Sequence, residues 1–291
     1  MNSEYVVARL LVCATGGQGL SRSRGIIWSM PVSDINDFDQ SVGHLVPGWT
    51  ARTRPAARPM TGSLCRLEPL DPTLHADDLY RANRADEKGR MWTYLSYGPF
   101  DSLTSYRDWL EGVAGREDPM FFAIIDASGR AVGIASFLRI DPSAGTIEVG
   151  HLAFSPAVQA TTAATEAMVH MMRAVFDELG YRRYEWKCDS LNAASRRAAQ
   201  RLGFVYEGTF RQAVVVKGRN RDTAWFSITD AEWPRLATAY ARWLAPDNFD
   251  GEGRQRIALS KLTLPDALSL PHPDRGGRQA QTSERRAGGR S

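Results

Sequence analysis

The chain has 291 residues, of which 43% are hydrophobic and 24% charged, as is typical of a globular protein with one large or two small domains. The formal net charge of +3 gives no reason to expect a nucleic-acid partner, and no apolar run is long enough to span a bilayer. The three cysteines are far apart and lack metal-ligand spacing, so we expect reduced thiols, no metal and a cytoplasmic protein.

The two ends of the chain differ in composition from its middle. Residues 1–61 lack clear periodicity and are rich in Gly, Ser, Pro and Arg, which favours a largely irregular N-terminal arm. Met30 offers an alternative start, so we leave open whether residues 1–29 belong to the native protein. Residues 251–291 are rich in Pro, Arg and Gly, and we expect them to form a disordered tail. One compact domain remains, over residues 62–250.

The first half of this domain contains a short strand, two helices and a meander of three strands. Periodicity and turn residues predict these elements, in order, at Leu64–Leu67, Asp71–Ala85, Ser102–Ala114, Phe121–Asp126, Ala131–Ile140 and Thr146–Phe154.

The second half begins with an amphipathic helix. Apolar residues recur at steps of three and four from Ala164 to Leu179, and Gly180 suits the left-handed position that ends a helix. Further elements are predicted at Arg183–Cys188, Asn192–Leu202, Val205–Val216, Thr223–Thr229 and Glu232–Leu244. This order indicates one mixed α/β layer fold.

The strand Thr146–Phe154 delivers the chain to the start of the amphipathic helix. Free N–H groups and the helix dipole favour an anion there, and Thr161, Thr162 and Thr165 add hydroxyl groups. Simple capping of the helix by a threonine is the alternative interpretation.

The same segment resembles the core motif of the GNAT acetyltransferases, most closely in the branch of the ribosomal-protein N-terminal acetyltransferases. The resemblance rests on Ile147–His151, Phe154–Pro156 and Gln159–Ala167. The family's pyrophosphate loop reads Gln/Arg-x-x-Gly-x-Gly/Ala. Thr162 stands where the family usually has Gly, so its Cβ narrows the loop, while its hydroxyl can donate to a phosphate oxygen.

A second motif follows at the expected distance. Asn192-Ala193-Ala194-Ser195 and then Arg201-Leu202-Gly203-Phe204 resemble the family's Asn-x-x-Ser…Leu-Gly-Phe signature. From the residues alone, Asn192 is equally explained as a helix cap. The resemblance covers residues 62–245 and implies a mainly antiparallel sheet flanked by helices, with acetyl-CoA as co-substrate. The cofactor-binding residues that it implies are Leu152, Phe154, Val158, Gln159, Thr161, Thr162, Ala163, Ala164, Asn192 and Ser195.

The implied reaction is acyl transfer from a thioester to a primary amine, which needs a base for the amine and a donor for the leaving thiolate. Glu148 is the first candidate base, because a carboxylate within an apolar strand is costly unless it is paired or functional. His151 is the alternative base. Ser195 or Tyr206 would support the thiolate, and the resemblance favours Ser195.

The acceptor pocket is expected around the aromatic run Trp92–Phe100. Trp92, Tyr94, Tyr97 and Trp186 are its candidate residues, although core packing explains such aromatic side chains equally well. We expect the acceptor to be an amine-containing small molecule or a peptide N-terminus, with no membrane or nucleic-acid partner, and leave a homodimer open. The rival hypothesis is a catalytically impaired GNAT-fold protein that binds acyl-CoA or a partner, and Thr162 favours it.

Overall fold

The computed structural model describes residues 34–264, which belong to two compact units that divide between Trp49 and Thr50. In the first unit, β1 (Asp34–Ile35) and β2 (Ser41–Val42) form a small antiparallel hairpin. Asn36 Oδ1 shapes its turn by accepting the N–H groups of Phe38 and Gln40, both at 3.0 Å. The expectations for residues 1–29, and for the tail from residue 265 onward, lie outside the described residues.

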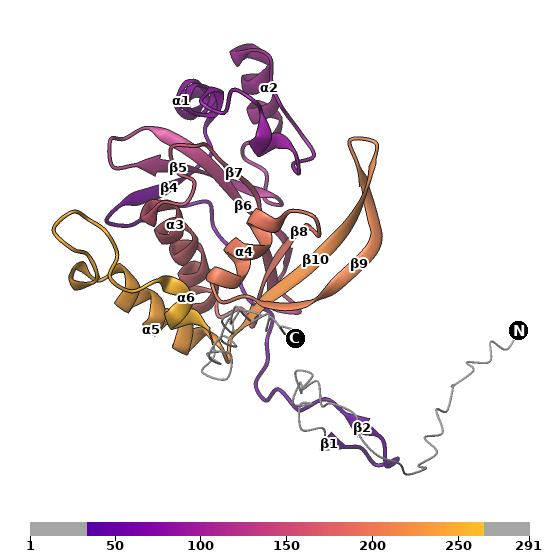
Figure 1. The fold of residues 1–291 in the computed structure, drawn as a ribbon. Coiled ribbons are helices and arrows are strands. Elements are labelled where there is room, and N and C mark those ends of the chain that lie inside the picture. The colour runs from indigo at the N-terminus through magenta and orange to yellow at the C-terminus, as the bar shows by residue number, and fades with distance from the viewer. Residues whose placement is uncertain (1–33, 265–291) are drawn as a thin grey trace, which may run out of the picture. The chain divides into compact units, whose positions relative to one another are not determined.

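The second unit is built on an eight-stranded sheet (Figure 1) in the order β3-β4-β5-β6-β7-β8-β10-β9. Every neighbouring pair is antiparallel except β7 and β8, which are parallel. The strands are β3 (Met60–Thr61), β4 (Cys65–Pro69), β5 (Met120–Asp126), β6 (Ala131–Asp141), β7 (Thr146–Phe154), β8 (Arg183–Asp189), β9 (Val205–Val216) and β10 (Arg219–Thr229). The predicted mixed fold with a mainly antiparallel sheet is therefore confirmed.

Helices connect the strands and pack on the sheet. They are α1 (Pro72–Arg84), the 3₁₀ turn η1 (Arg90–Trp92), α2 (Leu103–Val113), α3 (Thr162–Arg173), the π-helical turn η2 (Ala174–Glu178), α4 (Ala193–Arg201), α5 (Trp233–Leu244), the 3₁₀ turn η3 (Pro246–Asn248) and α6 (Leu259–Thr263). Thr161 caps α3, and Asn192 caps α4. Gly180 has φ +65°, as expected for the residue that ends the amphipathic helix.

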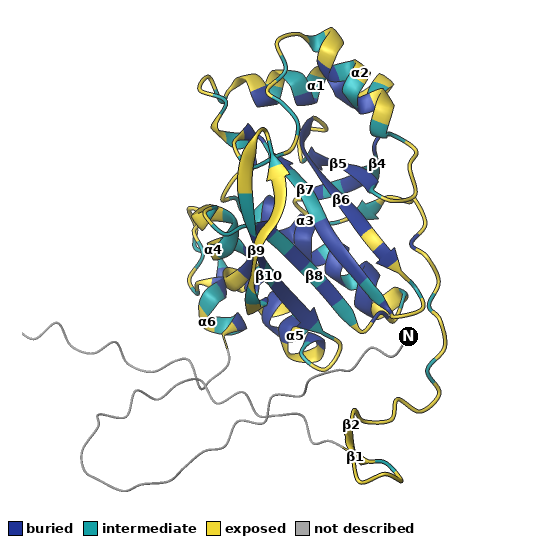
Figure 2. Cartoon of the chain, turned by 90° about the vertical axis from the view of Figure 1, so that its right-hand side faces the viewer, coloured by how far each residue is buried: buried dark blue, intermediate teal, exposed yellow. Residues whose placement is uncertain are grey.

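The sheet is buried on both faces along most of β5 and β6 (Figure 2). Alternate side chains of β5 point into two different cores, one on each face of the sheet, because successive residues of a strand point to opposite faces. Phe122 and Ile124 join the larger core with α3 and α5, whereas Phe121 and Ile125 join a smaller core with α1 and α2. The sheet is thus held between helices on its two sides.

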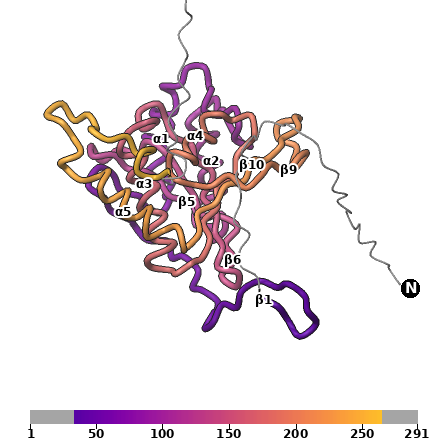
Figure 3. The backbone as a smooth tube through the Cα atoms, turned by 60° about the horizontal axis from the view of Figure 1, so that its bottom comes forward, coloured from indigo at the N-terminus to yellow at the C-terminus, as the bar shows by residue number. Residues whose placement is uncertain are grey.

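Two segments differ from the sequence-based boundaries. Residues 50–61, expected in an irregular arm, run along the second unit and end in β3; Arg52 N–H donates to Pro142 O at 2.9 Å. Residues 251–264, expected in a disordered tail, end instead in α6, where Leu259 is buried. Figures 1 and 3 show this yellow C-terminal segment beside α5. Neither β3 nor α6 is long enough to produce a recognisable periodicity.

Candidate active site

The parallel strands β7 and β8 pair over only part of their length. The paired residues are Thr146–Val149 of β7 and Arg183–Trp186 of β8. Beyond them β7 continues to Phe154, paired with β6 alone, and a register shift at His151, whose φ is +51°, marks a bulge. The strands therefore separate, and backbone groups of β7 from Gly150 onward are left without a partner strand on the β8 side. Such groups suit a carbonyl oxygen or an amide-containing ligand.

The loop that follows β7 leads directly into α3. Ser155 O accepts the N–H groups of Val158 and Gln159, and Thr161 Oγ1 accepts the N–H of Ala164 at 3.1 Å. At the first helical turn the N–H groups of Thr162 and Ala163 have no acceptor within residues 34–264. This turn can hold an anion.

The loop's side chains are already engaged with the protein. Gln159 Nε2 donates to Phe154 O at 2.7 Å, and Thr161 Oγ1 donates to Val158 O at 2.8 Å. Gln255 Nε2 donates to Thr162 Oγ1 at 3.1 Å. Val158 is buried beneath the loop. The first turn of α3 therefore offers an anion its backbone N–H groups, and the Thr162 hydroxyl lies on the same turn.

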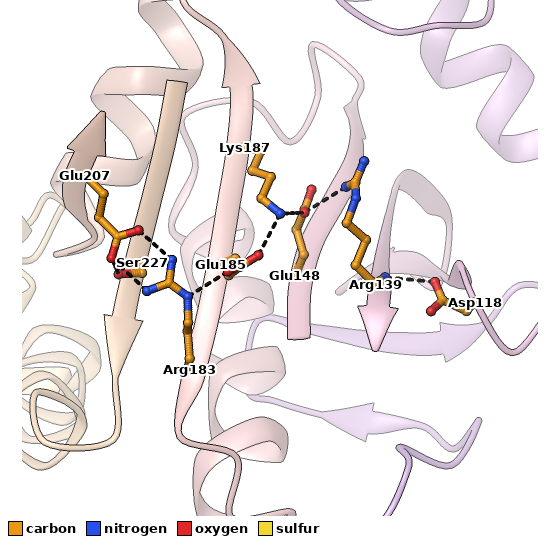
Figure 4. Close-up of polar contacts among 8 residues, drawn as sticks. All are labelled: Asp118, Arg139, Glu148, Arg183, Glu185, Lys187, Glu207 and Ser227. Carbon is orange, nitrogen blue, oxygen red and sulfur yellow. Dashed lines mark hydrogen bonds and ion pairs between the residues drawn. The ribbon is translucent and has the colours of Figure 1, made fainter. Parts of the chain in front are cut away.

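Glu148 lies on β7 immediately before the strands separate. Its side chain is buried, and its Oε2 accepts from Arg139 Nη1 at 2.8 Å and lies 2.9 Å from Lys187 Nζ (Figure 4). Burial raises the pKa of Glu148 above its ordinary value, while the two cations oppose this shift. Oε1 makes no hydrogen bond within the described residues and lies 3.6 Å from where a Cβ on Gly150 would be. One carboxylate oxygen is thus fixed by cations, and the other lies on the side where the strands open.

The ion pairs continue across the sheet (Figure 4). Lys187 Nζ lies 2.7 Å from Glu185 Oε2, and Arg183 Nε lies 2.6 Å from Glu185 Oε1. Arg183 also pairs with Glu207, 2.5 Å from its Oε2. Because charges alternate along this row, no buried carboxylate in it lacks a cation.

His151 lies at the bulge of β7. Its ring stacks on Tyr97 with 5.7 Å between centroids and lies 4.9 Å from the Phe121 ring. Burial, and then the charge of Arg139, lower the pKa of His151 to about 4. Its imidazole is therefore neutral near pH 7 and able to accept a proton.

The aromatic run between α1 and α2 meets the tip of the β9–β10 hairpin. Lys217 Nζ donates to Trp92 O at 2.8 Å and to Tyr97 O at 3.2 Å. Tyr94 OH donates to Leu191 O, in the loop between β8 and α4, at 3.2 Å. Tyr97 lies against His151, as described above. These contacts bring three separate segments to the region of the β7 bulge.

The Trp92 ring belongs to the smaller core. It packs edge-on against Tyr97, Phe100 and Tyr106, and little of it is exposed. For this candidate the core-packing interpretation holds. Trp92 also lines a cavity of about 440 Å³, whose other walls are mainly the end of α1, residues 86–89 and residues 99–101, and which no other predicted site residue lines.

Trp186 and the α4 motif form a connected group. Trp186 Nε1 donates to Ser195 Oγ at 2.9 Å, and Asn192 Oδ1 accepts the Ser195 N–H at 3.0 Å. The Asn192 side-chain oxygen thus acts as a helix cap. Ser195 Oγ is an acceptor from Trp186 in this arrangement. Burial raises the pKa of the neighbouring Cys188 thiol, and a hydrogen bond from the Ser195 hydroxyl opposes that rise, so this hydroxyl already serves as a donor to a sulfur atom.

Four residues that contact the candidate site were not predicted from the sequence: Arg139, Lys187, Lys217 and Gln255. Lys187 had a usable signal, since Arg183, Glu185 and Lys187 alternate along one predicted strand and so share a face. Arg139 is nine positions from Glu148 on the neighbouring predicted strand, so the register of that strand pair was its signal. Lys217 and Gln255 are far in sequence from their partners and carried no local signal.

The chain is similar in sequence and fold to known acetyltransferases. The Acetyltransferase (GNAT) domain model matches residues 65–205. A GCN5-related N-acetyltransferase from Brucella melitensis, of known crystal structure, is 46% identical, with a TM-score of 0.73; the match covers 75% of this chain and 99% of that chain. The SPbeta prophage-derived uncharacterized N-acetyltransferase YokL of Bacillus subtilis (strain 168) is 27% identical over 132 residues, 45% of this chain and 73% of YokL.

The ribosomal L7/L12 alpha-N-protein acetyltransferase RimL shares the fold. Its TM-score is 0.52 at 20% identity, and the match covers 62% of this chain and 99% of that chain. A parallel strand pair next to a helix start, on a mainly antiparallel sheet, is the arrangement found in this chain, and its fold matches those of these acetyltransferases. The chain belongs to the GNAT family of N-acetyltransferases, whose members use acetyl-CoA as co-substrate.

Two further observations concern residues 34–264. No helix in this range is long and apolar enough to cross a membrane. In the same range, no three His, Cys, Asp or Glu side chains lie together as a metal site would require.

Proposed function

We propose that the protein binds acetyl-CoA between β7 and β8 and transfers the acetyl group to a primary amine by direct attack in a ternary complex. The separation of β7 and β8 beyond Val149 and Trp186 carries this proposal, because it leaves backbone groups of β7 free beside the start of α3. The acceptor is a small molecule or a protein N-terminus. Free, buried Cys65 and Cys188 favour a cytoplasmic location.

Binding would use backbone groups more than side chains. The N–H groups of Thr162 and Ala163 would hold the pyrophosphate, and the β7 backbone near Leu152 and Phe154 would hold the pantetheine arm and polarise the thioester carbonyl. Acetyl-CoA would supply an activated acyl carbon and a good leaving group. Holding both substrates together then supplies much of the rate.

The base in this proposal is Glu148, acting through a water molecule. Its raised pKa makes it a better proton acceptor than an ordinary carboxylate, and Arg139 and Lys187 stabilise its ionised form against the effect of burial. As the amine nitrogen bonds to the acyl carbon and the carbon–sulfur bond breaks, Glu148 takes the amine proton. Ser195 would donate its hydroxyl proton toward the departing sulfur.

His151 remains the alternative base. The neutral imidazole implied by its lowered pKa accepts a proton, but a group with a pKa of about 4 is a weak base. Tyr94 and Tyr97 remain candidates for the acceptor pocket, next to the three segments that meet at the β7 bulge. The Trp186 ring is buried in the larger core and donates to Ser195, so it would act through that serine. Trp92 would shape this pocket through its carbonyl oxygen, which accepts from Lys217, because its ring is packed in the smaller core.

A catalytically impaired acyl-CoA-binding protein is the second candidate function. Thr162 favours it, because a Cβ stands where the family's loop usually has none. The two functions differ in turnover: both predict binding of acetyl-CoA, and only the first predicts release of free thiol that depends on an amine.

The test is a thiol-release assay with acetyl-CoA and a panel of amino acids, polyamines, aminoglycosides and N-terminal peptides. We expect turnover with at least one amine and a loss of about 100-fold or more in kcat for Glu148→Gln, the size typical of a missing general base. Glu185→Gln removes the other carboxylate that pairs with Lys187 and serves as the matched control, with a much smaller loss. If the wild-type protein binds acetyl-CoA but turns over no amine, the impaired function is correct.

A further inference from the structure

The segment between α5 and α6 lies beyond the matched family domain yet reaches the start of α3. It is folded tightly around two side chains. Asn248 is buried, donates from Nδ2 to Trp243 O at 2.8 Å and accepts the Ile257 N–H at 2.9 Å. Asp250 Oδ1 accepts the N–H groups of Glu252 and Arg254 at 3.0 and 2.8 Å.

The segment is anchored at its far end as well. Leu259 of α6 is buried in the larger core, and Thr263 Oγ1 donates to Arg201 O, at the end of α4, at 2.9 Å. Arg235 of α5 donates to Thr263 O at 2.8 Å. Residue 255 lies between these two fixed ends, so its position is set by the fold.

Gln255 from this segment meets Thr162, the residue at which the chain departs from the family's usual pyrophosphate loop. The Gln255 amide donates to Thr162 Oγ1 at 3.1 Å. A hydroxyl that accepts through a lone pair must donate its proton in another direction. Within the described residues Thr162 Oγ1 has no acceptor for that proton, and the same helical turn presents the free N–H groups of Thr162 and Ala163.

We propose that Gln255 is a positioning residue that orients the Thr162 hydroxyl as a donor to a pyrophosphate oxygen of acetyl-CoA. This inference rests on the proposed function, because it needs the cofactor to bind at the start of α3. In the family's usual loop, a glycine lets the backbone come close to the phosphates. Here the Thr162 hydroxyl replaces part of that contact with a hydrogen bond. The C-terminal segment thereby becomes part of the cofactor site.

The test measures acetyl-CoA affinity by calorimetry for Thr162→Val, Gln255→Leu and the double variant. Each single change should weaken affinity about tenfold, as expected for one hydrogen bond to a charged group. The double variant should be no weaker than Thr162→Val, because Gln255 acts only through the hydroxyl. Gln255→Glu, which can accept but not donate, should also weaken binding.

Two controls separate positioning from general distortion. Thr162→Ser keeps a hydroxyl and should retain most of the affinity, and Thr238→Val removes an exposed hydroxyl of α5 and should change nothing. The kcat/KM for S-acetylpantetheine, which lacks the pyrophosphate, should be the same in the wild-type protein and in Gln255→Leu.

Three outcomes would overturn the inference. Wild-type affinity in Gln255→Leu, or an equal loss with acetyl-CoA and S-acetylpantetheine, contradicts the role of Gln255 while leaving the proposed function intact. Absence of acetyl-CoA binding by the wild-type protein contradicts both proposals.

Discussion

At the residue scale, Glu148 is buried, and its two carboxylate oxygens differ in their hydrogen-bond partners. Oε2 meets Arg139 and Lys187, whereas Oε1 is free of hydrogen bonds within the described residues. A buried carboxylate without cations would take up a proton, and one with all its lone pairs occupied would be a poor base. Here the two cations stabilise the charged form while burial opposes it, and one oxygen is left available. This arrangement explains why a costly residue stands within an apolar strand.

His151 makes stability depend on pH. Its pKa is lowered from 6.5 to about 4 in the folded protein, so the unfolded chain binds a proton between these values that the folded protein does not bind. The contribution of neutral His151 is present above pH 6.5 and is lost as the pH falls toward 4. Between pH 7 and pH 5 the free energy of unfolding should therefore fall by about 2 kcal/mol through this residue.

The measurement is urea denaturation of the wild-type protein and of His151→Gln at the two pH values. The variant should lose less stability than the wild type over this interval, by the stated amount. Equal losses in the two proteins would show that His151 is protonated in the folded state as readily as in the unfolded state.

At the scale of elements, Glu166 of α3 joins the helix to the edge of the sheet. Its carboxylate accepts the N–H groups of Ser63, Leu64 and Cys65 at 3.0, 2.7 and 2.9 Å. The turn between β3 and β4 is thereby fixed to the helix whose first turn is proposed to hold the pyrophosphate. A Cβ at Gly62 would collide with Glu166 and His170, so this turn also requires a glycine.

Glu166→Ala should destabilise the fold by about 3 kcal/mol, because it leaves N–H groups at this turn without an acceptor. Gly62→Ala should also destabilise it, by displacing the same carboxylate. Chemical denaturation measures both effects. Glu111→Ala, an exposed change on α2, is the control and should stay within about 0.5 kcal/mol. A wild-type unfolding free energy in Glu166→Ala would contradict the structural role of this contact.

At the scale of the whole molecule, strongly patterned strands were predictable and short or distant elements were not. Thr146–Phe154 and Val205–Val216 were predicted with the observed bounds, since their patterns are long and turns flank them. β3 has two residues and α6 has five, so neither shows a period, and α6 depends on packing against α4 and α5. The sequence also could not foresee that a long C-terminal segment would return to α3.

In the candidate site, too, residues within a local sequence motif were predictable and residues brought in from distant segments were not. Motif residues such as Glu148, Thr162 and Ser195 were identifiable because the resemblance ties them to neighbouring residues in the chain. Gln255 was not, because it lies 93 positions from Thr162 and only the folded chain brings them together. For Trp92 the sequence left pocket lining and core packing open, because aromatic residues in a loop do not reveal which rings pack into the core; the structure buries its ring in the smaller core.

In the proposed function, acetyl-CoA binds at the opening between β7 and β8 and at the first turn of α3. Hydrogen–deuterium exchange with and without acetyl-CoA tests it most directly, because the proposed contacts are backbone amides. We expect slower exchange in residues 150–154 and 158–164, with no change around η1 at the separate cavity. Unchanged exchange in both segments while acetyl-CoA binds would contradict the account.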